Sequence, residues 1–136
     1  MLKRITLVAA FVSLVAAGLL MAQQPANTPP MAPIKRTLLQ KADVPGTNLE
    51  IIYAIVEIIP GFKAGRHSHP GVVMAQVVDG EFWIQFDGQP EQILRVGESL
   101  TLPDRAVHNE GSTDKPLKLN VVYVVEKGKP LVSPAN

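Results

Sequence analysis

The sequence predicts an all-β fold, and three observations support this prediction. The chain of 136 residues is long enough for one domain and leaves little room for a second. From residue 34 onward, β-branched and aromatic runs are separated by turn residues about every 8–12 positions, which is typical of sandwiches and small barrels. No stretch of this part combines 3.6-residue periodicity with helix-capping residues.

The expected strands follow from runs of isoleucine, valine and alternating aromatic residues. Segment 82–86 alternates large apolar side chains with others, as a half-buried strand does. Asp79-Gly80 before it predicts a hairpin turn, and Asp87-Gly88 after it turns the chain again. A short strand is expected at His108, after the turn at Pro103-Asp104. The remaining expected strands are residues 48–59, 72–78, 93–94, 99–102 and 117–125.

The first 22 residues have the three parts of a secretory signal peptide. Lys3 and Arg4 form a positive start, and an uncharged run follows from Ile5 to Leu20. We expect cleavage after Ala22 and a secreted or periplasmic protein that has left the membrane. The alternative is an uncleaved anchor, although the run is short for a helix that needs about 20 apolar residues to span a bilayer.

Composition excludes several classes of protein. Without residues 1–22 the formal net charge changes from +1 to −1, so no basic surface indicates nucleic acid. The chain has no cysteine, which excludes disulfide scaffolds, thiolate metal sites and cysteine nucleophiles. Residues 23–33 carry four prolines and are expected to form an extended linker. We therefore expect a domain over residues 34–130 and a C-terminal tail over residues 131–136.

The three histidines of the chain are the clearest candidates for a functional site. His67 and His69 are two positions apart, so on a strand their imidazoles point to the same face. Two imidazoles on one face can bind a single metal ion. His108 is distant in sequence, but antiparallel pairing could place it opposite this pair.

The residues around these histidines resemble the two motifs of the cupin superfamily. The matching positions are Gly61, His67, His69 and Gly80 for the first motif and Gly97, Pro103 and His108 for the second. The resemblance covers roughly residues 35–130 and implies a double-stranded β-helix, or jelly-roll barrel, with a pocket inside. It also implies that the three histidines are metal ligands, and that two chains pair as a homodimer.

The sequence departs from the family at the fourth ligand. Cupins usually supply a glutamate shortly after the second histidine, where this chain has Val73 and Met74. A site of three neutral imidazoles keeps the full charge of a divalent ion, so it is expected to favour an anionic ligand. Fe, Zn, Ni or Cu is then expected over manganese, which prefers oxygen. Three alternatives stay open: Met74 as a copper ligand, Glu57 as the missing carboxylate, and histidines that hold no metal.

Several other side chains are candidates for the pocket or its mouth. Asp104 and Arg105 precede His108 in a loop that could gate the pocket, and Asn109 could orient a neighbouring ligand. Ordinary packing or surface roles are the alternative for each candidate. The possible pocket residues are Arg66, Val73, Gln76, Trp83, Gln85, Tyr53 and Tyr123.

Two functions from different classes fit this sequence. The first is a metal-dependent enzyme, a dioxygenase, lyase or isomerase, that acts on a small organic molecule with an anionic or carbonyl group. The second is a non-catalytic cupin that has lost the ligand glutamate and binds or senses a small molecule. No phosphate-binding loop and no Ser-His-Asp arrangement is evident.

Overall fold

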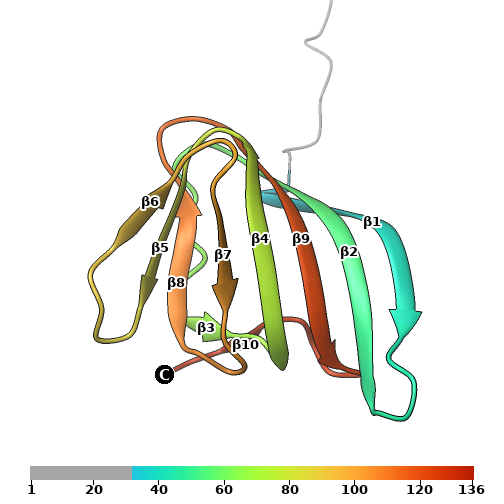
Figure 1. Ribbon diagram of the computed structural model, residues 1–136. Helices are drawn as coiled ribbons and strands as arrows, with labels where there is room; N and C mark the ends of the chain where they lie inside the picture. Colours follow the sequence, from blue (N-terminus) through green and yellow to red (C-terminus); the bar gives the residue numbers. More distant parts are fainter. Residues whose placement is uncertain (1–31) are drawn as a thin grey trace, which may run out of the picture. The chain divides into compact units, whose positions relative to one another are not determined.

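The computed structural model describes residues 32–136, which form ten strands and no helix (Figure 1). The predicted signal peptide and all but the last two residues of the predicted linker lie outside the described residues. Within residues 32–136, no helix could cross a membrane. The strands are β1 (Ile34–Asp43), β2 (Leu49–Ile58), β3 (His67–Ser68), β4 (Gly71–Asp79), β5 (Phe82–Phe86), β6 (Gln92–Leu94), β7 (Ser99–Leu102), β8 (His108–Ser112), β9 (Leu117–Glu126) and β10 (Ser133–Pro134).

The strands form two five-stranded sheets, and every pairing is antiparallel. One sheet has the order β1-β2-β9-β4-β7 and the other has the order β10-β3-β8-β5-β6. Sequence neighbours often lie in different sheets, as β4 and β5 do, which is the arrangement of a jelly roll. The expected double-stranded β-helix is confirmed.

The hydrophobic core lies between the two sheets because apolar residues alternate along the strands. In β9 every second side chain is buried, from Leu117 to Val125, and in β4 the buried positions include Val73 and Val77. Phe82 and Ile84 of β5 join this core from the other sheet. Side chains of a strand point alternately to its two faces, so the apolar residues at every second position all face the core.

One connection and one strand differ from the prediction. Asp79-Gly80 does not close a hairpin, because β4 and β5 belong to different sheets; the turn carries the chain across the barrel. The strand β1 was not predicted. Nearly all of its residues are exposed, so it shows no alternation between buried and exposed positions that a sequence could reveal.

The C-terminal residues are part of the barrel rather than a separate tail. β10 pairs with β3, with Pro134 opposite His67. The main-chain N–H of Ala135 also donates to the carbonyl of Arg66 at 3.0 Å. The expected boundary at residue 130 therefore omits a strand, which is too short for a sequence pattern.

Candidate metal centre

Strand pairing brings the three histidines together in the interior. His67 on β3 lies directly opposite His108 on β8, and His69 follows two positions later. Their exposed fractions are 3%, 6% and 0% for His67, His69 and His108. The ring centroids are 4.4–5.1 Å apart. The expected antiparallel approach of His108 to the other two histidines is thus what the structure shows.

Main-chain carbonyls fix which nitrogen of each histidine faces the centre of the cluster. The Nδ1 atoms of His67, His69 and His108 lie 2.7, 2.6 and 2.9 Å from the carbonyl oxygens of Gly65, Leu131 and Ala106. A carbonyl only accepts, so each Nδ1 carries the hydrogen. In the neutral imidazole each Nε2 is then left with a free lone pair, as a metal ligand requires.

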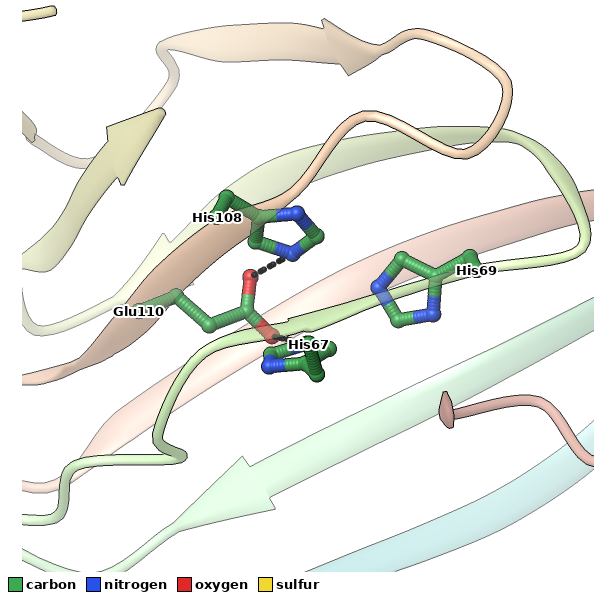
Figure 2. A group of neighbouring side chains, drawn as sticks. All are labelled: His67, His69, His108 and Glu110. Atoms are coloured by element: carbon green, nitrogen blue, oxygen red, sulfur yellow. Dashed lines mark ion pairs between the residues drawn. The ribbon is translucent and has the colours of Figure 1, made fainter. Parts of the chain in front are cut away.

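A carboxylate completes the cluster from the same strand as His108. The oxygens of Glu110 lie 3.6 Å from Nε2 of His67 and 3.5 Å from Nε2 of His108 (Figure 2). The side chain of Glu110 is 19% exposed. One ligand atom from each of the four residues lies within 4.8 Å of the others, a set that can hold a metal ion.

The electrostatics of the cluster favour an ionised Glu110 carboxylate. Burial opposes ionisation of Glu110, but the imidazoles of His108 and His67 outweigh it and lower the pKa of Glu110 to about 2. Burial also lowers the pKa of His69. At His67, burial again acts to lower the pKa, but contact with Glu110 prevails and the pKa is raised.

The donor atoms fit a divalent cation. Nε2 of His108 is buried without a hydrogen-bond partner among the described residues, which is costly for a polar atom. Three groups face this atom. Two are imidazole nitrogens, which are acceptors in the neutral ring, and the third is a carboxylate, which is an acceptor when ionised. Acceptors that converge in this way are stabilised by a cation between them. Imidazole with one carboxylate suits Fe, Zn, Ni, Cu or Mn.

Glu110 is a potential metal ligand that the sequence did not predict. The expected glutamate position is occupied by Val73, which is buried, and Met74, which is 50% exposed on the outer face and cannot reach the cluster. Glu57 lies elsewhere and forms an ion pair with Lys35 at 3.4 Å. The signal that could have found Glu110 is its spacing: two positions after His108, it shares that residue's face of the strand.

A narrow cavity of about 20 Å³ adjoins the cluster. His69 and Glu110 form one side of it, and of the expected pocket residues it includes Val73 and Tyr123. The Tyr123 ring is 6.0 Å from that of His69, centroid to centroid. Burial raises the pKa of Tyr123, so its hydroxyl is protonated at neutral pH and can donate to a ligand. The volume suffices for about one or two water-sized groups.

The other expected pocket residues lie outside this cavity. Tyr53 and Gln76 line a shallow groove on the outer face of the first sheet, because alternation turns them away from the core. Gln85 is exposed and donates to the carbonyl of Gln89 at 3.3 Å. Trp83 is buried, and its indole N–H donates to the Ser112 carbonyl at 3.2 Å. The pocket interpretation is therefore wrong for these four residues.

Arg66 has a surface role instead of a place in the cavity. Its guanidinium forms an ion pair with Asp87 at 2.5 Å and donates to the main-chain oxygen of Asn136 at the same distance. Because Arg66 directly precedes His67, these contacts hold the start of β3. For Arg66, the structure agrees with a surface salt bridge and not with a position in the pocket.

The loop before His108 is held in place by ion pairs. Arg105 contacts Asp104 at 2.7 Å and also pairs with Glu126, and its main-chain N–H donates to the His69 carbonyl. Its φ of 55° is unusual for a residue other than glycine. Asn109 accepts from the N–H groups of Gly65 and Glu110, so it satisfies backbone donors.

The fold and the cluster together define a double-stranded β-helix with three buried histidines and a partly buried glutamate as potential metal ligands. The family model of the cupin domain, Cupin_2, matches residues 54–126, which is more than half of the chain. The chain therefore belongs to the cupin family. A search of curated proteins found no match.

Solved structures with similar folds agree with this assignment. A cupin superfamily protein from Desulfitobacterium hafniense is 16% identical, with a TM-score of 0.58, over 68% of this chain and 78% of that one. A cupin-like protein from Thermotoga maritima is 21% identical, with a TM-score of 0.60, over 76% of each chain. The DMSP lyase DddQ from Ruegeria pomeroyi is 17% identical, with a TM-score of 0.62, over 83% of this chain and 56% of that one. At these identities the likeness is one of fold.

Proposed function

We propose that this chain is an exported cupin that binds a divalent transition metal and acts on a small organic molecule. The ligands are His67, His69, His108 and Glu110. The observation that carries the proposal is the set of three contacts from Nδ1 atoms to main-chain carbonyls, which leave three Nε2 lone pairs near one carboxylate. Contacts of this kind fix the tautomer and the ring orientation of metal-binding histidines, which supports the proposal.

The protein's own groups divide the remaining tasks. A bound ion would act as a Lewis acid or bind oxygen and substrate together. Glu110 lowers the net charge of a loaded centre from +2 to +1. Tyr123 offers a hydroxyl donor to a ligand in the cavity, and the apolar walls exclude water from it. Among residues 32–136, Glu110 is the only carboxylate that lines this cavity.

The reaction class remains a proposal at the level of dioxygenase, lyase or isomerase. The similarity of fold to a DMSP lyase supports chemistry on a small organic substrate. A second candidate is a non-catalytic binding protein. The main argument for a non-catalytic protein was that the sequence lacks a glutamate at the usual ligand position, and the position of Glu110 removes that argument. The small size of the cavity still favours a non-catalytic binding protein.

The identity of the metal follows from the ligand set only in part. Fe, Zn, Ni or Cu was expected because three imidazoles alone disfavour manganese. The carboxylate of Glu110 supplies one oxygen, so manganese joins the candidates.

Elemental analysis of the purified protein tests metal binding. We expect about one equivalent of metal in the wild type and a loss in His67→Ala, His69→Ala, His108→Ala and Glu110→Gln. Glu57→Gln is the matched control, since Glu57 pairs with Lys35 at the surface. Less than about a tenth of an equivalent after reconstitution with each metal would overturn the proposal. Screening the loaded protein for oxygen uptake and for turnover of small organic acids separates enzyme from binding protein.

We also propose export and self-association. Cell fractionation with and without residues 1–22 tests export, and a mature N-terminus at Gln23 is the expected result. Pairing as a homodimer is supported by β1, an edge strand of ten residues with unpaired backbone groups on its outer side.

A further inference from the structure

Arg36 differs from the other arginines of the described chain in having no carboxylate partner. Residues 32–136 contain four arginines. Arg66, Arg95 and Arg105 each form an ion pair with an aspartate or a glutamate. Within the same part of the chain, no carboxylate oxygen lies within ion-pairing distance of Arg36. A guanidinium without a partner is available for an anionic ligand.

The register of β1 directs Arg36 towards the cavity. Arg36 pairs with Val56 of β2, whose side chain is buried in the core, so both residues share the inner face of the sheet. Arg36 is an exposed residue, yet it lines the cavity together with Tyr123, His69 and Glu110. It therefore stands at the mouth, between solvent and the metal ligands.

The electrostatics agree with this position. Burial raises the pKa of Tyr123, and the guanidinium of Arg36 beside its hydroxyl acts in the opposite direction. Arg36 thus lines the same cavity as Tyr123 and lies close enough to act on its hydroxyl.

We propose that Arg36 and the Tyr123 hydroxyl form a carboxylate-binding site at the mouth of the cavity. The inference rests on the proposed function and specifies its ligand as a small carboxylic acid, whose far end points into the cavity that His69 and Glu110 also line. A guanidinium and a hydroxyl supply donors to both oxygens of a planar carboxylate. A carboxylic acid can extend an apolar group from the mouth into the cavity, whose walls are mostly apolar, and inorganic phosphate cannot.

The body of the ligand is expected to be small and apolar. Apart from the polar residues already named, the cavity is lined by aliphatic and aromatic side chains, among them Val73, Leu119 and Val121. A centre with a divalent ion and Glu110 retains one positive charge, and Arg36 adds another at the mouth. A site with this sign of charge and low-dielectric walls concentrates anions.

Calorimetric titration of the metal-loaded protein tests the inference. Formate and acetate are the probes, formamide and acetamide are their neutral counterparts, and inorganic phosphate is the tetrahedral anion. We expect at least one acid to bind the wild type more tightly than its amide and than phosphate. The variant Arg36→Gln should weaken that binding by about tenfold or more, Arg36→Lys by less, and Tyr123→Phe to an intermediate degree. Arg95→Gln, which removes an exposed guanidinium paired with Glu81, should bind as the wild type does.

The outcomes distinguish this inference from the proposed function. If metal is bound but Arg36→Gln leaves carboxylate affinity unchanged, or if phosphate binds best, the carboxylate site is overturned and the metal centre stands. If no metal is bound, the proposed function fails, and the titration is repeated on the metal-free protein. Carboxylate binding that depends on Arg36 then supports the site, and its absence overturns it. Metal content and melting temperature of each variant are measured first, and Arg36→Gln should change neither.

Discussion

Glu110 and His108 lie two positions apart on one face of β8, with a Glu110 oxygen 3.5 Å from Nε2 of His108. One short strand therefore supplies both an imidazole and the only carboxylate of the cluster. The position where cupins usually place this carboxylate is filled by Val73, which lines the cavity instead. The cluster thus offers four potential metal ligands, although its glutamate comes from a different strand.

Replacing Glu110 tests whether this carboxylate is a ligand. Glu110→Gln keeps the size of the side chain but removes its charge, so metal affinity should fall by more than about 100-fold. Even groups that only orient a ligand contribute about 10–100-fold. Competition with a chelator of known affinity measures the loss. An affinity within a factor of three of that of the wild type would show that Glu110 does not touch the metal.

The C-terminal segment should support metal binding through His69. The Leu131 carbonyl accepts from Nδ1 of His69 at 2.6 Å and so holds the ring and its tautomer. Deleting residues 131–136 should lower metal affinity by about 10–100-fold. Deleting only residues 133–136 keeps Leu131 and serves as the control, with a smaller effect expected. Equal losses in the two deletions would assign the effect to β10 rather than to Leu131.

The stability of the metal-free protein should depend on pH through Glu110. The pKa of Glu110 is about 2 in the folded protein, below the usual value of about 4.3 in an unfolded chain. Its contribution to the free energy of unfolding, on the order of 1–3 kcal/mol, is present above about pH 4.3 and is lost as the pH falls towards 2. The raised pKa of His67 acts in the other direction, because its contribution is full below about pH 6.5 and fades as the pH rises.

Urea unfolding of chelator-treated protein between pH 2 and 8 measures this dependence. The wild type should lose more stability than Glu110→Gln between pH 5 and 2. Parallel curves for the two proteins would contradict the prediction.

Gly111 should be intolerant of any side chain. A Cβ at this position would lie 1.8 Å from the Phe62 carbonyl oxygen and 2.9 Å from the indole nitrogen of Trp83. Gly111→Ala should therefore cost about 1–3 kcal/mol or more and displace the adjacent Glu110. Gly88→Ala is the control, since nothing lies within 4 Å of its Cβ and only the cost of its positive φ remains. A melting temperature of Gly111→Ala at or above that of the control would refute this packing argument.

The proposed homodimer should depend on β1. Leu38 is 59% exposed on this edge strand, and a lysine there opposes pairing of two edges. Light scattering at several concentrations should show a dimer for the wild type and a monomer for Leu38→Lys. Val96→Lys, at a residue 62% exposed outside the strands, should leave the dimer intact. A wild-type protein that is monomeric at every concentration would contradict the proposed homodimer.

The sequence by itself determined the fold class, most strands and three members of the cluster. Alternating burial in β4 and β9 has a period of two, which one chain segment reveals without its neighbours. His67 and His69 were found for the same reason, because a spacing of two places both on one face.

Only the tertiary structure decided the fourth potential ligand, the cavity and the contacts of the C-terminus. Arg36 reaches the cavity because β1 pairs with β2 in one particular register, and Leu131 reaches His69 across 62 positions of sequence. These contacts depend on how distant segments meet, and no local pattern encodes that. Glu110 lies between the two cases: its spacing from His108 was visible, but only the pairing of β8 with β3 showed that this face points at His67.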